Sequence, residues 1–228
     1  GFPLSRDSNL SIEYSFDQED IKLTAASNTV SPIIIGDVGK KNKSALIFTY
    51  SLDKTNSVVT PTAGYDFRII QELNGLGGDI SYSKSDLNFK TYRTILRDDI
   101  ILSSDLSSGV ILGSDASIMN RFTLGGDRLK GFRNQGIGPY DSTYATHLGG
   151  KMYTSLSLEA SFPIGIPEEY GIYGGVFLDT GSLWGLDNNN SVKIIDDSSE
   201  IRSALGFSIF WESAIGPLRF NWSSPIKK

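Results

Sequence analysis

The chain of 228 residues contains no cysteine and a single histidine, His147. Disulfide bonds and thiolate zinc sites are therefore excluded, and a histidine-ligated metal site or a Ser-His-Asp triad has little to build on. Basic residues do not outnumber acidic ones, since 21 lysines and arginines stand against 26 aspartates and glutamates. A nucleic-acid-binding protein would carry a basic excess on one face. The composition therefore predicts no nucleic-acid partner, and nothing in it indicates an enzyme, a cofactor or a metal site.

Long apolar runs are also missing. No stretch approaches the roughly 18 to 20 consecutive apolar residues of a membrane-spanning helix, and no signal peptide is visible. The segment at Gly1 reads as a strand already under way, and the segment at Lys228 stops where a hairpin loop should begin. We therefore expect a fragment of a longer protein, in which case the missing signal says nothing about its compartment.

What the sequence does contain is strict alternation of apolar and polar residues, which is typical of strands, whereas helical spacing is rare. The connections between alternating segments are short at 5–8, 96–98, 163–170 and 214–217, and long at 24–43, 113–150 and 185–200. This predicts an all-β, antiparallel, up-and-down sheet of about nine strands, after a short N-terminal stub at 1–4. The clearest strands are at 10–17, 46–52, 65–69, 154–162, 205–211 and 218–222, and weaker ones are at 78–95, 98–112 and 170–184.

The composition of the polar face of these strands helps to distinguish a soluble β-sandwich from a membrane β-barrel. It mixes serine, glycine and threonine with charged residues such as Glu159, Asp179 and Arg219. In a soluble sandwich the apolar face forms the core, whereas in an outer-membrane barrel it meets lipid and the polar face lines a wet lumen. Periodicity alone does not separate the two, but the charged face favours the transmembrane barrel over a soluble sandwich or a lipocalin-like binder. Aromatic residues expected in the interfacial girdles of such a barrel are Tyr170, Trp184, Trp211 and Trp222.

The stretch RFTLGGDRLKGFRNQGIGP, at 121–139, carries the most specific motif of the chain. It resembles the long sixth loop of the BamA (surface antigen D15) family, which has a phenylalanine, two glycines and an Arg-Gly-Phe tripeptide at the loop tip. The resemblance covers essentially the whole chain and is nearest to alphaproteobacterial members. Further similar segments are 50–53 with 61–65, 148–163, 175–184 and 216–220.

The resemblance implies a sixteen-strand barrel that follows periplasmic POTRA domains. Residues 1–228 would form a single, partial outer-membrane barrel domain, from the end of strand six to strand fifteen, with the sixth loop at about 113–150. The POTRA domains and the last strand would be absent. The implied function is the folding and insertion of other barrel proteins, in the outer membrane of a Gram-negative bacterium. The implied partners are outer-membrane lipid, unfolded barrel clients and, in the full-length protein, accessory assembly lipoproteins.

Two alternative functions remain open on the sequence. The first is a passive outer-membrane pore or surface antigen with no assembly role. The second is a soluble β-sandwich that binds a ligand. Reconstitution into liposomes separates an insertase from a pore, and dependence on detergent separates both from a soluble protein.

A candidate site also follows from the resemblance, because the tip arginine of the family enters the lumen and contacts acidic residues on the barrel wall. The corresponding tip residues here are Lys130, Gly131 and Phe132, and the wall partners would be Glu159 and Asp179. Alternation places both carboxylates on the polar face, so both should point into the lumen. A cation that meets carboxylates in a restricted space forms a charge-assisted anchor.

The tip cation is the one departure from the family motif. Lys130 stands where the family has arginine, and lysine offers a point charge without the planar, two-pronged contact of a guanidinium. Arg128 or Arg133 could therefore share the role. The alternative interpretation is a solvated loop lysine beside a hydrated lumen carboxylate.

Overall fold

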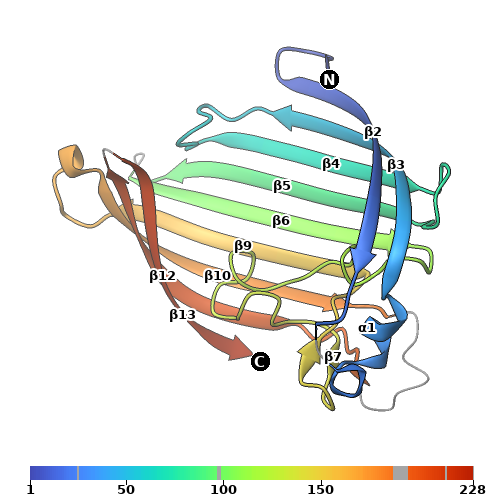
Figure 1. The fold of residues 1–228 in the computed structure, drawn as a ribbon. Coiled ribbons are helices and arrows are strands. Elements are labelled where there is room, and N and C mark those ends of the chain that lie inside the picture. The colour runs from blue at the N-terminus through green and yellow to red at the C-terminus, as the bar shows by residue number, and fades with distance from the viewer. Residues whose placement is uncertain (25, 97–98, 187–194, 214, 228) are drawn as a thin grey trace.

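A single curved sheet dominates the computed structural model, which describes residues 1–24, 26–96, 99–186, 195–213 and 215–227 (Figure 1). Ten strands follow one another in chain order, apart from short elements in the loops, and each is antiparallel to its neighbours. The described residues therefore contain the nine long strands and the stub that alternation predicts. The strands are β1 (Phe2–Pro3), β2 (Ser8–Ile21), β3 (Gly39–Asp53), β4 (Gly64–Asn74), β5 (Ser83–Ile95), β6 (Ile100–Leu112), β9 (Met152–Pro163), β10 (Ile172–Trp184), β12 (Arg202–Ser213) and β13 (Gly216–Lys227).

The nine long strands have 11 to 15 residues each. Spanning a bilayer with a tilted strand takes roughly 9 to 11 residues, so each of them is long enough. The connections at one end of the sheet have two to ten residues, whereas those at the other end have eight to 39 residues. Two of the expected short connections fall partly outside the described residues, at 97–98 and at 214.

Short elements in the long loops escape the sequence pattern. They are the helix α1 (Pro32–Gly36), the 3-10 turn Ser27–Thr29, and a small sheet in which β7 (Tyr140–Asp141) lies between β8 (Thr146–His147) and β11 (Ile195–Asp196). A further 3-10 turn, Glu168–Tyr170, lies at the opposite end. Segments of two to five residues are too short to show a period. None of the helices that the structure describes is long and apolar enough to span a membrane.

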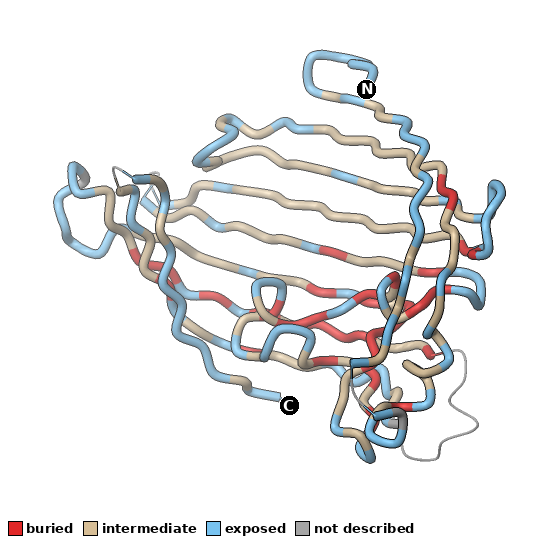
Figure 2. Tube along the Cα trace, in the orientation of Figure 1, coloured by how far each residue is buried: buried red, intermediate tan, exposed pale blue. Residues whose placement is uncertain are grey.

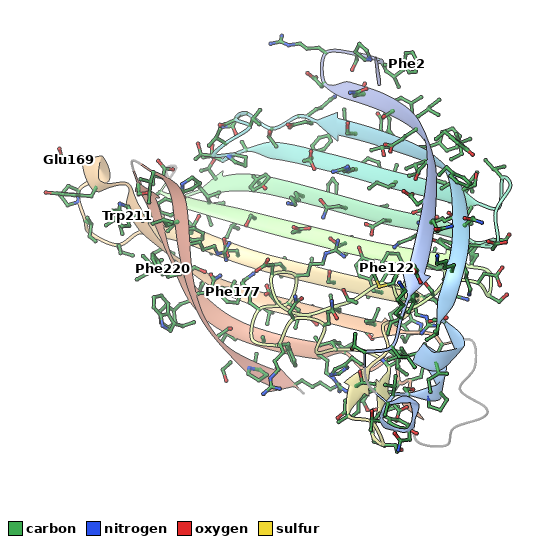
Figure 3. All side chains as sticks on the ribbon, viewed as in Figure 1. Phe2, Phe122, Glu169, Phe177, Trp211 and Phe220 are labelled. Carbon is green, nitrogen blue, oxygen red and sulfur yellow. The ribbon has the colours of Figure 1, made fainter. Side chains whose placement is uncertain are left out.

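The two faces of the sheet differ as the membrane barrel requires. Phe207 and Phe220 are 51% and 49% exposed on the convex face, whereas Glu159 and Arg219 lie on the concave face and pair with each other. Figure 3 shows Trp211 and Phe220 on the side away from the loop, and Phe122 and Phe177 on its side. A soluble sandwich would bury the first group instead. The fold is thus a partial, antiparallel transmembrane barrel.

Trp222, one of the aromatic residues expected in the interfacial girdles, does not lie at the end of its strand. Trp222 lies in the middle of β13 and stacks on Phe207, with 4.9 Å between the ring centres and 12° between the ring planes. It therefore belongs to the lipid-facing band of the strand and not to its end.

Buried residues gather on the concave side, beneath the loop between β6 and β9 (Figure 2). We call residues 113–151 the lumen loop. It packs its own apolar side chains against the inner wall, so the core of this molecule lies inside the curve of the sheet. The cluster consists of Ile80, Tyr82, Ile111, Ala116, Phe122, Leu124, Leu129, Ile137, Tyr153 and Leu183.

Candidate functional site

The lumen loop folds back on itself before it reaches the wall. Phe122 and Gly150 exchange two backbone hydrogen bonds of 2.9 and 3.0 Å, and Leu124 bridges to Ile137. Gly125 has a φ of 123°, and a Cβ atom there would lie 2.1 Å from the backbone oxygen of Arg133. No larger residue fits at this crossing, which explains one of the two glycines of the motif.

Apolar side chains of the loop fit into hollows of the wall. The fully buried Leu129 lies against Gly181 of β10, where a Cβ atom would come within 2.8 Å of its Cδ1. The Phe122 ring lies 4.7 Å from that of Tyr153 on β9. Burying a leucine or phenylalanine stabilises by roughly 1.5–3 kcal/mol, so these contacts hold the loop inside the barrel independently of charge.

The tip cation meets one of the two predicted carboxylates. The Lys130 ammonium lies 3.0 Å from Oδ2 of Asp179 and donates to its Oδ1 at 3.2 Å. The backbone N–H of Lys130 donates to Oδ2 at 2.8 Å, and the Ser157 hydroxyl donates to Oδ1 at 2.6 Å. Asp179 has no exposed surface, and the Lys130 side chain is 12% exposed. Two charges buried together are stable only with such additional hydrogen bonds.

The other two tip residues contact the wall as well. Gly131 has a φ of 95°, and a Cβ atom there would lie 3.0 Å from the Cβ of Ala204 on β12. Phe132 is partly buried against the apolar cluster. The Lys130 ammonium also lies 4.4 Å from the ring centre of Phe177, within range of a cation–π interaction. We call residues 130–132 the loop tip.

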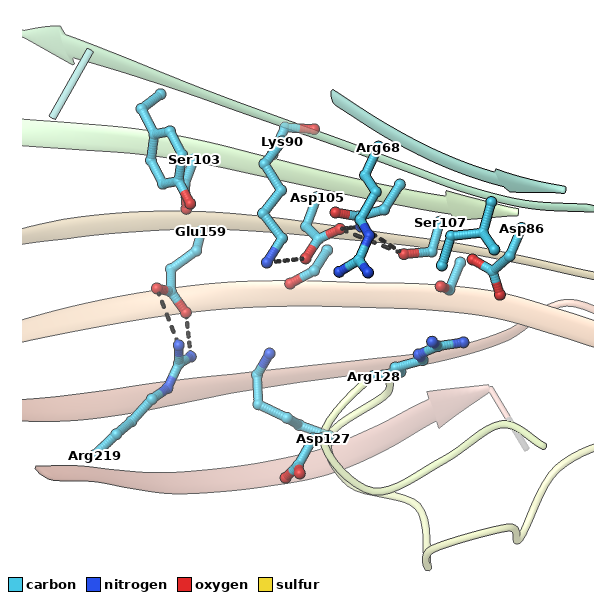
Figure 4. A pocket seen from close by; sticks show the side chains of 17 residues that line it. Arg68, Asp86, Lys90, Ser103, Asp105, Ser107, Asp127, Arg128, Glu159 and Arg219 are labelled. Atoms are coloured by element: carbon cyan, nitrogen blue, oxygen red, sulfur yellow. Dashed lines mark hydrogen bonds and ion pairs between the residues drawn. The ribbon is translucent and has the colours of Figure 1, made fainter. Parts of the chain in front are cut away.

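Glu159, the second predicted wall partner, is engaged elsewhere. Its carboxylate forms an ion pair with the guanidinium of Arg219 on β13, in which Nη1 lies 3.4 Å from Oε1 (Figure 4). Arg219 reaches it across β10 and β12, and its guanidinium lies 4.7 Å from the ring centre of Phe210. The prediction that the tip cation contacts both carboxylates therefore needs correction. The point charge of Lys130 pairs with Asp179 alone, and the planar guanidinium that pairs with Glu159 comes from Arg219 on the wall itself.

The two arginines that could have shared the role of the tip cation make other contacts. The guanidinium of Arg128 lies 5.2 Å from the ring centre of Tyr153, and Arg133 contributes its backbone oxygen to a hydrogen bond from Gly136. The positive charge on Asp179 thus comes from Lys130.

A second attachment, which the sequence does not predict, lies at the start of the lumen loop. The nearly buried Asn120 donates from Nδ2 to Glu19 on β2 at 3.0 Å, and its Oδ1 accepts from the Tyr82 hydroxyl at 2.9 Å and from Lys43 on β3 at 3.2 Å. Its backbone oxygen accepts from Lys84 on β5 at 2.8 Å. Burial raises the pKa of Tyr82 to about 12, so the phenol stays protonated and donates. We call residues 116–121 the loop base.

The loop base is also tied to the loop between β2 and β3. Asp37 accepts a hydrogen bond from the backbone N–H of Ile118 at 2.8 Å and lies 3.5 Å from the guanidinium of Arg121. Farther along, the Ser31 hydroxyl donates to the fully buried Asp141 at 2.7 Å. Two long connections thus form one hydrogen-bonded cap over that end of the lumen.

The lumen below the loop tip contains a charged cavity of about 600 Å³. Lys90 and its cross-strand neighbour Asp105 form an ion pair of 3.5 Å on the cavity wall, both 40% exposed, and Figure 4 shows this pair beside Glu159 and Arg219. Among the described residues no group of three or more histidines and carboxylates could hold a metal ion. The arrangement can hold a loop against a wall and keep the remaining space wet.

Comparisons with known proteins find a matching family and individual relatives. The sequence profile of the Omp85 superfamily domain matches residues 1–228. The chain is 28% identical over 221 residues to "Outer membrane protein assembly factor BamA" of Neorickettsia risticii, which covers 96% of this chain and 29% of that protein. It is 30% identical over 182 residues to "Sorting and assembly machinery component 50 homolog" of Mus musculus, covering 75% of this chain and 38% of that protein.

A solved structure shows the same fold. BamA from Haemophilus ducreyi, lacking POTRA domains 1–3, superposes with a TM-score of 0.79 at 22% identity, over 100% of this chain and 49% of that one. The chain therefore spans less than half the length of each of these three relatives.

Proposed function

Since this chain belongs to the Omp85 superfamily, we propose that it forms part of the barrel of an outer-membrane assembly factor that folds and inserts other β-barrel proteins. The protein acts without an enzymatic step, in the outer membrane of a Gram-negative bacterium. Its partners are membrane lipid, unfolded barrel clients and, in the full-length protein, accessory assembly lipoproteins. The names of the bacterial and mouse relatives, which refer to assembly, support this proposal.

The physical basis of such an activity is the cost of unpaired backbone groups in lipid. Each unsatisfied N–H or C=O in the hydrocarbon region is expensive, and a free strand edge presents a row of them. An insertase offers an edge with which a client strand pairs, so that client and insertase satisfy each other during folding. Such a process needs a barrel whose remaining wall keeps its shape.

The observation that carries the proposal is the anchored loop tip. A passive pore gains nothing from a long loop whose lysine is buried on a wall carboxylate, since the loop occupies the lumen that a pore keeps open. Lys130 and Asp179 lose hydration on burial, and the chain compensates with the Ser157 hydroxyl and a backbone N–H. We infer that the lumen loop holds the inner wall in the geometry that client folding requires.

A charge swap in the full-length protein tests this function. The variants are Lys130→Asp, Asp179→Lys and the two together, each reconstituted into liposomes with an unfolded barrel client. We expect both single variants to slow client folding and the double variant to recover part of the rate, because it restores an ion pair in the opposite sense. A double variant as defective as either single one would contradict the role of the pair. Acceleration of client folding by the wild type distinguishes an insertase from a pore, which would only leak solute.

A further inference from the structure

The convex face of the sheet carries an arginine near the end where the shorter connections lie. On β5, Lys90 points into the lumen toward Asp105, so alternation places Thr91 and Arg93 on the convex side. Their partners on β6 are Ser104 and Leu102. Arg93 is exposed, and no hydrogen bond or ion pair joins it to any residue that the structure describes. A cation on the lipid-facing side of a barrel is costly unless it lies at the membrane interface or finds a counter-charge.

A groove of about 540 Å³ runs from this arginine across β6, β9, β10 and β12 on the same face. The small side chains of Ser104 and Ala160 form the bottom of the groove, and the larger side chains of Leu158, Val176 and Leu205 form its sides. Small residues between large ones leave a hollow in an otherwise continuous apolar band. The groove therefore combines a cation at one end, hydroxyl groups beside it, and apolar walls beyond.

We propose that this groove binds a phospholipid of the surrounding bilayer. The phosphate pairs with the Arg93 guanidinium, whose planar fork matches two phosphate oxygens. The hydroxyls of Thr91 and Ser104 lie at the level of the glycerol esters, and an acyl chain follows the hollow along Leu158 and Val176. Charge complementarity selects this occupant, because a purely apolar partner would leave the arginine unpaired at the edge of its own contact surface. The proposal requires only that the convex face meets lipid, and it is independent of client folding.

Native mass spectrometry of the full-length protein in detergent tests the site. The protein is titrated with phosphatidylglycerol and, in a second arm, with diacylglycerol of the same chains. We expect one phosphatidylglycerol to be retained more tightly than the rest. Arg93→Gln should weaken its retention by about tenfold, the size of a lost charge-assisted contact, and Arg93→Lys should weaken it less. Diacylglycerol should show no such dependence on residue 93.

Two further variants separate the groove from a general effect of charge. Ala160→Phe fills the hollow, leaves Arg93 in place and should also release the lipid. Lys40→Gln removes a cation from the convex face of β3, at the end of the sheet opposite to Arg93. This variant should leave lipid retention unchanged. Equal retention by the wild type, Arg93→Gln and Ala160→Phe would overturn the proposal. A dimer of the chain that Ala160→Phe dissolves would overturn it too, by assigning the groove to a second copy.

Discussion

The base and the tip of the lumen loop are attached in opposite ways. At the base, Asn120 shares its hydrogen bonds among Glu19, Lys43, Tyr82 and Lys84, so no single contact is decisive. At the tip, one buried carboxylate on β10 receives the whole charge of Lys130. The polar contacts of the base are therefore redundant, whereas at the tip the buried charge depends on a single carboxylate. We expect the tip to be the part of the loop whose docking governs activity.

The largest effect should follow Asp179→Ala. The substitution leaves the ammonium and backbone N–H of Lys130 and the hydroxyl of Ser157 without their acceptor, and breaking a buried pair in this way costs on the order of 3 kcal/mol. Denaturant unfolding of the full-length protein in lipid measures it. The matched control is Asp105→Ala, whose half-exposed pair with Lys90 should contribute about 1 kcal/mol or less. Equal losses in the two variants would mean that burial of Asp179 adds nothing.

A smaller loss is expected for Asn120→Ala at the base. Lys43 keeps its ion pair of 2.7 Å with Glu72, so the cost reduces to unpaired hydrogen-bonding groups, about 1–3 kcal/mol. Hydrogen exchange in residues 116–121 should rise while the tip stays protected. Ser114→Ala, on an exposed part of the same loop, serves as the control and should leave exchange unchanged. Release of the tip in Asn120→Ala would contradict the separation of base from tip.

A double-mutant cycle sharpens the corrected assignment of Glu159. The side chain of Arg219 is one-third exposed, so screening limits the pair to about 1 kcal/mol or less. The cycle between Glu159→Gln and Arg219→Gln should show coupling in unfolding free energy. The cycle between Glu159→Gln and Lys130→Gln should show none. Coupling only in the second cycle would restore the two-carboxylate anchor that the sequence predicts.

The smallest expected effect is a change in the stability of the cap with pH, caused by His147, which lies outside the barrel sheet. Burial lowers the pKa of this imidazole. In the unfolded chain the imidazole has a pKa of about 6.5. Below that pH it is protonated more readily in the unfolded chain than in the folded cap, so the cap loses stability as pH falls. The protection of residues 140–147 against hydrogen exchange, taken relative to the intrinsic exchange rate at each pH, should be lower at acidic than at neutral pH, and His147→Gln should remove part of the difference. An identical pH response in this variant would exclude the histidine.

Alternation predicts the strands well for a physical reason. Each strand has lipid on one side and a wet lumen on the other, so a period of two is imposed along nearly its whole length. The strand expected at 98–112 is observed as Ile100–Leu112. By contrast α1, β7 and β11 have only two to five residues and depend on contacts between loops, which leave no period in the sequence.

The site is only partly readable from the sequence. The contact of Lys130 with Asp179 follows from the resemblance and from the parity of β10. The pairing of Glu159 with Arg219 does not, because 60 residues separate the two and the curvature of the sheet brings them together. The loop base is missed for another reason, since a lone asparagine in a loop carries no signal. The sixteen-strand count and the POTRA domains stay predictions.

A designed disulfide shows whether the loop tip lies on the inner wall of the barrel. The chain has no cysteine, so Gly131→Cys with Ala204→Cys introduces one pair, and a Cβ at Gly131 lies 3.0 Å from that of Ala204. This is close to the roughly 3.5–4.5 Å of natural disulfides. The control, Gly131→Cys with Leu205→Cys, moves the second cysteine to the convex face and keeps any strain at Gly131. We expect a disulfide in the first pair and none in the second. No cross-link in either pair, or one at Leu205 alone, would contradict this placement of the loop tip.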